Sequence, residues 1–78
     1  MLQLGRAIRK VRNKRKLSQN ALGKLVGVDA SYINKIENNK APGSLLTIKK
    51  IAEALNCTLT ELMALAESTE SEEEIMVS

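Results

Sequence analysis

The chain has 78 residues, enough for one small domain, and 44% are hydrophobic although Phe and Trp are missing, so we expect an aliphatic core of packed helices. The single cysteine excludes an internal disulfide framework, and the lack of histidine excludes a zinc finger and a Ser-His or Cys-His nucleophile. The sequence shows no apolar run of ~20 residues, as a membrane span requires, and no signal-peptide pattern. The net charge of the chain is +3, but residues 1–66 contain twelve Lys and Arg and only four Asp and Glu, a local charge of +8. This excess favours a polyanionic partner, first nucleic acid and second a membrane surface.

Apolar residues recur at helical spacing in five segments, and no segment shows sustained alternation with a period of two residues. Each of the last four segments follows a residue that can cap a helix: Ser18, Asp29, Ser44, and Thr58 with Glu61 in a capping-box pattern. The sequence therefore predicts an all-α fold of five short helices. The apolar residues that we expect to face its core are Leu4, Ile8, Val11, Leu22, Leu25, Val26, Ile33, Ile36, Leu45, Ile48, Ile51, Ala52, Leu55, Leu59, Leu62 and Met63.

The first predicted helix carries most of the positive charge, because seven of the twelve cations lie between Arg6 and Lys16. For most of them a solvated helix face is a sufficient explanation. Lys14, Arg15 and Lys16 lie at the end nearest the second helix, where phosphate contact is plausible.

The stretch 17–40 predicts a helix-turn-helix, with one helix over 19–26 and a second over 30–37. Gly23 allows the two helices to cross closely, and Gly27 allows the turn to adopt a positive φ. Ile33 and Ile36 hold the second helix from inside. The residues left outside are short or polar, as an element that approaches base edges in a major groove ~12 Å wide requires: Ala30, Ser31, Tyr32, Asn34 and Lys35.

The last part of the chain is acidic. Residues 67–78 hold five Glu and no basic residue, with almost no apolar periodicity. We interpret this segment as a disordered acidic tail that follows a domain over residues 1–66.

The segment Leu17–Leu62 resembles the lambda-repressor-like, or Cro/XRE-type, helix-turn-helix family, and Leu4–Arg12 resembles its first helix. The markers, all in register, are Ser18-Gln19, Leu22, Gly27-Val28, Ile33, Ile36-Glu37, Lys40, Ser44-Leu45, Ile51-Ala52, Ala54-Leu55 and Leu59–Leu62. The resemblance implies a five-helix DNA-binding domain of a bacterial or phage transcriptional regulator such as a repressor, in the cytoplasm with the nucleoid. It also implies a homodimer on a pseudo-palindromic operator in double-stranded DNA.

The resemblance assigns roles residue by residue. Base contacts are expected from Ala30, Ser31, Asn34 and Lys35. Phosphate contacts are expected from Gln19, Asn38 and Lys40, to which we add Arg15 and Tyr32, although Tyr32 could instead pack against the second helix. Arg12 and Glu37 match a pair that ties the first helix to the end of the third. A dimer interface is expected at Leu46, Met63 and Leu65, of which the last two could instead be core residues.

Two alternatives differ in class from a DNA-binding regulator. A protein-interaction module of the same fold, of antitoxin or coactivator type, would suit the acidic tail. An enzyme has almost no support, because there are no paired carboxylates in an apolar setting and no phosphate-cradling loop. We therefore expect no catalysis, cofactor, metal or small-molecule substrate. Because Ala30 offers only a methyl group, base recognition is expected to depend on Ser31, Lys35 and DNA shape.

Overall fold

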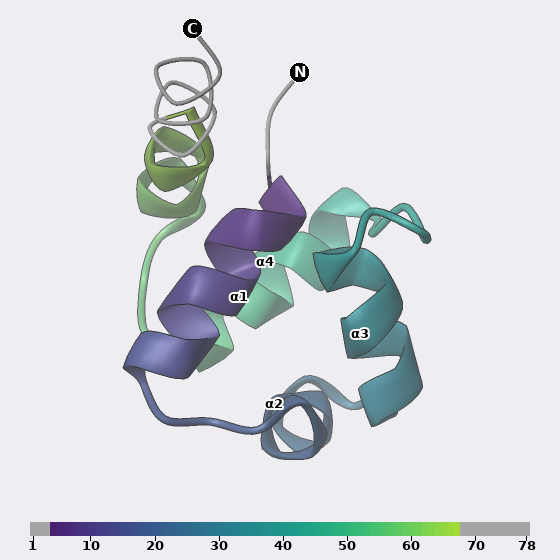
Figure 1. The fold of residues 1–78 in the computed structure, drawn as a ribbon. Helices are drawn as coiled ribbons and strands as arrows, with labels where there is room; N and C mark the ends of the chain where they lie inside the picture. The colour runs from purple at the N-terminus through teal and green to yellow at the C-terminus, as the bar shows by residue number, and fades with distance from the viewer. Residues whose placement is uncertain (1–3, 68–78) are drawn as a thin grey trace, which may run out of the picture.

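The computed structural model describes residues 4–67, which form five helices and, within that range, no strand. The helices are α1 (Leu4–Lys14), α2 (Gln19–Val26), α3 (Ala30–Glu37), α4 (Leu45–Ala54) and a last helical segment over residues 59–67. In Figure 1, α2 is seen almost end-on beneath α3, and the last segment lies beside α1. The predicted all-α fold is confirmed. The predicted acidic tail lies outside the described residues except for Glu67, which is helical.

All four predicted helix caps are present. The side-chain oxygens of Ser18 and Asp29 each accept a hydrogen bond from a backbone N–H three residues later, at 2.9 Å. Ser44 makes the same contact at 3.1 Å. Thr58 Oγ1 accepts from the N–H of Glu61 at 3.0 Å, and the Glu61 carboxylate accepts in return from the N–H of Thr58 at 3.3 Å. Each cap satisfies a donor that the first helical turn leaves unpaired, a contribution of about 1 kcal/mol.

The helix-turn-helix depends on two glycines in the way the sequence predicts. Gly27 ends α2 with φ at +92°, a left-handed conformation that glycine adopts without steric cost. A Cβ atom at Gly23 would lie 2.6 Å from the carbonyl oxygen of Val28, so only glycine permits this crossing. After α3, Asn39 has φ at +58° and takes a left-handed conformation at the end of that helix, which asparagine tolerates better than most residues.

The core lies where the helices meet, and its largest fully buried apolar residues are Ile8, Leu22, Ile33, Ile51, Leu55 and Leu62. Three residues predicted to face it do not. Leu25 is 62% exposed because Leu22, Gly23 and Val26 set the inward direction of α2, and Leu25 points about 110° away from it at 100° per residue. Leu45 and Met63 are 73% and 41% exposed because they lie about 70° and about 80°, respectively, from the centre of the buried stripe of their helices.

None of the described helices is long and apolar enough to cross a membrane.

Candidate nucleic-acid interface

The outer face of α3 is open to solvent. Ser31, Asn34 and Lys35 are exposed and lie within about 100° of each other around the helix. Ala30, at the first position of α3, is half-buried. Tyr32 is also half-buried and packs against the hydrophobic core. The structure therefore brings three of the four predicted base-contact residues together on an accessible surface.

A buried carboxylate lies behind the C-terminal end of this face. Glu37 is 1% exposed and accepts hydrogen bonds from Arg12 Nε at 2.6 Å and Arg12 Nη2 at 3.1 Å. It also accepts from Gln19 Nε2 at 3.2 Å and from Arg9 Nε at 3.3 Å. Burial by itself raises the pKa of Glu37, but the hydrogen bonds from Arg12 and Gln19 and the charge of Arg12 outweigh it, so the pKa is lowered. Glu37 is therefore an ionised anchor shared by α1, α2 and α3.

Gly5 brings α1 close enough to make these contacts. A Cβ atom at this position would lie 2.5 Å from the carbonyl oxygen of Ile36 and 2.6 Å from that of Glu37. Arg9 and Arg12 follow Gly5 by four and seven residues, so they lie on the same face of α1 and reach the end of α3. The need for a glycine here was not predicted, because no local turn or cap marks the position.

The same network holds three of the predicted DNA-contact residues. Gln19 Oε1 accepts from Asn34 Nδ2 at 3.5 Å while its amide nitrogen donates to Glu37. Asn38 Nδ2 donates to the carbonyl oxygen of Asn34 at 2.9 Å, and Asn38 Oδ1 accepts from Arg9 Nη2 at 2.6 Å. The amides of Gln19, Asn34 and Asn38 are thus fixed relative to each other before any ligand arrives.

The role of Arg9 in this network was not predicted, because the sequence indicated only a solvated cation at this position. Its spacing of three residues from Arg12 was the available signal, because such a pair shares one helix face.

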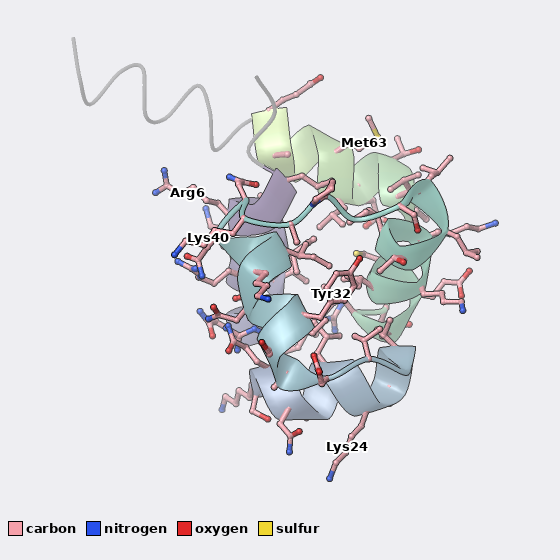
Figure 2. The ribbon with its side chains drawn as sticks, turned by 90° about the vertical axis from the view of Figure 1, so that its right-hand side faces the viewer. Arg6, Lys24, Tyr32, Lys40 and Met63 are labelled. Carbon is pink, nitrogen blue, oxygen red and sulfur yellow. The ribbon has the colours of Figure 1, made fainter. Side chains whose placement is uncertain are left out.

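Lys40 lies one short turn beyond the network, where its backbone N–H donates to the carbonyl oxygen of Lys35 at 2.8 Å. Arg6 and Lys40 project from the same side of the molecule, away from Met63 (Figure 2).

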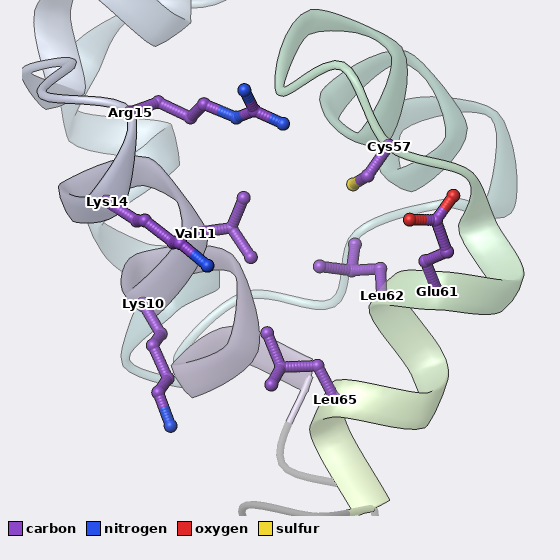
Figure 3. A pocket seen from close by; sticks show the side chains of 8 residues that line it. All are labelled: Lys10, Val11, Lys14, Arg15, Cys57, Glu61, Leu62 and Leu65. Atoms are coloured by element: carbon purple, nitrogen blue, oxygen red, sulfur yellow. The ribbon is translucent and has the colours of Figure 1, made fainter.

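Arg15 and Leu65 lie elsewhere, around a hollow of about 490 Å³ between α1 and the last helical segment (Figure 3). Arg15, in the turn that follows α1, extends toward the segment that carries Cys57, and Leu65 packs partly against the core. Burial and the charge of Glu61 raise the pKa of the Cys57 thiol, so the thiolate is disfavoured. Within the described residues, no group of three or more His, Cys, Asp or Glu side chains is arranged to hold a metal ion.

A helix-turn-helix family model matches residues 8–62, which include all four helix caps, the turn at Gly27, α3 and the Glu37 network. The chain belongs to the Cro/C1-type helix-turn-helix family. Among members of this family, it is 34% identical over 64 residues to the control protein C.MunI of a Mycoplasma species, covering 81% of this chain and 86% of that protein. It is 42% identical over 64 residues to the transcriptional repressor RghR of Bacillus subtilis, covering 81% of this chain but only 47% of the repressor.

Among solved helix-turn-helix structures, the P22 c2 repressor in complex with a synthetic operator superposes with a TM-score of 0.72 at 33% identity. The match covers 81% of this chain and 94% of that one. The family model covers α2, the turn and α3, so α3 of this chain corresponds to the second helix of the helix-turn-helix motif.

Proposed function

We propose that this chain is a sequence-specific transcriptional regulator that binds double-stranded DNA with α3 in the major groove and acts as a repressor. The observation that carries the proposal is the exposed polar face of Ser31, Asn34 and Lys35, which adjoins a network anchored on a fully buried carboxylate. Family membership and the similarity to an operator-bound repressor support it. Within this proposal residues 1–66 form the DNA-binding domain, and the protein acts in the cytoplasm without catalysis, cofactor or small-molecule substrate.

In this arrangement Ser31, Asn34 and Lys35 read base edges, and Ala30 offers its methyl group to a thymine methyl. Gln19 and Asn38 hold phosphates on either side of the groove, because their amides are already oriented by the Glu37 network. Phosphate contacts from Lys40 and the Tyr32 hydroxyl complete the proposed surface, whereas Arg15 lies apart from it, at the hollow that Cys57 and Leu65 also line. Lys35 carries the strongest test of base recognition, since a lysine can donate to guanine O6 and N7.

We further propose that the regulator is a homodimer. Leu46 and Met63 are 63% and 41% exposed, as is expected of side chains that a second copy covers. Leu65 follows Met63 by two residues, so it lies about 200° around the helix from it; its side chain packs partly against its own core and faces away from the surface that Met63 occupies. A two-fold axis through this face would set two α3 helices about 34 Å apart, one turn of B-form DNA.

The test is selection of binding sites from a random duplex pool, followed by titration of the selected site and a scrambled duplex across a range of salt concentrations. We expect a two-fold sequence motif, tighter binding to the motif than to the scrambled duplex, and a steep decrease of affinity with salt. A protein-interaction module would give neither a motif nor a salt-dependent affinity for duplex DNA, and that result would refute the proposal.

A further inference from the structure

The Glu37 network contains more positive than negative charge. Two guanidinium groups, those of Arg9 and Arg12, contact the single Glu37 carboxylate, and the lowered pKa of that carboxyl keeps it ionised. The other members, Gln19, Asn34 and Asn38, are neutral amides. One positive charge therefore stays without a compensating anion inside a network that faces the proposed DNA surface.

The two arginines divide their donors differently. Arg12 donates through all three of its nitrogens, from Nε and Nη2 to Glu37 and from Nη1 to the carbonyl oxygen of Leu17 at 2.8 Å, and its side chain is only 11% exposed. Arg9 donates through Nε to Glu37 and through Nη2 to Asn38, and its side chain is 42% exposed. Since a guanidinium group has five N–H donors, Arg9 keeps three of them, including both on Nη1, for another acceptor.

From this asymmetry we propose that Arg9 binds a DNA phosphate, while Arg12 serves only the fold. The ligand is a phosphodiester on the strand that passes the C-terminal end of α3, because the Arg9 guanidinium lies 2.6 Å from Asn38 Oδ1 at that end. A planar guanidinium group that is already held on one edge presents its other edge to two phosphate oxygens with little further loss of rotamer freedom. The inference rests on the proposed function and adds a residue from α1 to its DNA-binding surface.

The contact also makes Arg9 a positioning residue for Asn38. The Asn38 side-chain oxygen accepts from Arg9, and its nitrogen donates to the carbonyl oxygen of Asn34, so both ends of the amide are fixed. The remaining N–H of Asn38 and the free edge of Arg9 then lie next to each other as a combined donor set for one phosphate. A lysine at position 9 would keep the charge but would lack the second donor edge.

The test compares the unmodified protein with Arg9→Gln, Arg9→Lys and Lys50→Gln on the selected duplex at several salt concentrations. Lys50 is an exposed cation of α4, so its variant controls for the loss of one positive charge. For Arg9→Gln we expect the slope of log K against log salt to fall by about 0.9, the value for one phosphate, and affinity at 0.1 M salt to fall about eightfold. For Arg9→Lys we expect the slope of the unmodified protein, and for Lys50→Gln we expect no change in slope.

The salt slope separates a DNA contact from a purely structural role. If Arg9 only supported Glu37, Arg9→Gln would lower the melting temperature and leave the slope unchanged, and that result would overturn the inference. Equal decreases in slope for Arg9→Gln and Lys50→Gln would also overturn it, because they would reflect net charge alone. If the unmodified protein bound no duplex at all, the proposed function itself would fail, and the Arg9 inference with it.

Discussion

Glu37→Gln tests the network at its centre. The carboxylate is 1% exposed and accepts four hydrogen bonds, two of them from Arg12. Glutamine has nearly the same shape, but it removes the charge and replaces one acceptor oxygen with an NH2 group that faces cationic donors. Arg12, whose side chain is 11% exposed, is then left as a largely buried cation without a counterion.

Breaking one partner of a buried ion pair costs about 3–5 kcal/mol, and the remaining amide oxygen recovers part of this, so we expect a loss of about 2–4 kcal/mol. For a domain of this size such a loss lowers the melting temperature by roughly 10–25 °C, which is measured by thermal denaturation followed by circular dichroism. Glu53→Gln, at an exposed position of α4, is the matched control and should melt close to the unmodified protein. If Glu37→Gln melted together with Glu53→Gln, the reasoning about the buried pair would be refuted.

The pH dependence of the same variant gives an independent check. The pKa of Glu37 is lowered in the folded protein relative to its ordinary value of 4.5, so its stabilising contribution is complete above that value and is lost as the pH falls through the lower folded-state pKa. The stability difference between the unmodified protein and Glu37→Gln should therefore be largest near neutral pH and should shrink below pH 4.5. A difference that stayed constant into acid would show that the lost stability does not come from the charge.

Three further predictions concern recognition, helix packing and assembly. Lys35→Ala should weaken binding to the selected site by about 1–3 kcal/mol and affect a scrambled duplex less, whereas equal losses in a titration of both would exclude base recognition. Gly5→Ala should lower the free energy of unfolding, measured by urea titration, more than Gly27→Ala does. The added Cβ atom at position 5 would lie 2.5 Å from a carbonyl oxygen. At position 27 it would meet nothing within 4 Å, so that variant should lose only about 1–2 kcal/mol, the cost of the left-handed conformation. A Leu46→Ser, Met63→Ser double variant should sediment as a monomer at concentrations where the unmodified protein is a dimer, and an unchanged dimer would place the interface elsewhere.

The sequence determines the features of this protein that depend on neighbours within a few residues. Ser18, Asp29 and Thr58 were predictable as caps because each bonds to a backbone N–H three residues away. Gly27 was predictable because its left-handed φ closes the turn between two adjacent helices. The five helices, the helix-turn-helix and the exposed face of α3 all follow from such local rules together with the spacing of apolar residues.

Only the tertiary structure decided which residues meet across the fold. Arg9 reaches Glu37 and Asn38 across 28 and 29 positions of the chain, and Gly5 is required by the carbonyl oxygen of Ile36. Helical spacing shows which apolar residues could share a face, but the packing decides which side of the helix is covered; the covered side of α2 is that of Leu22 and Gly23, so Leu25 is exposed. Contacts of this kind depend on the angle and distance at which α1 crosses α3, and those are fixed by the packing of all the helices at once.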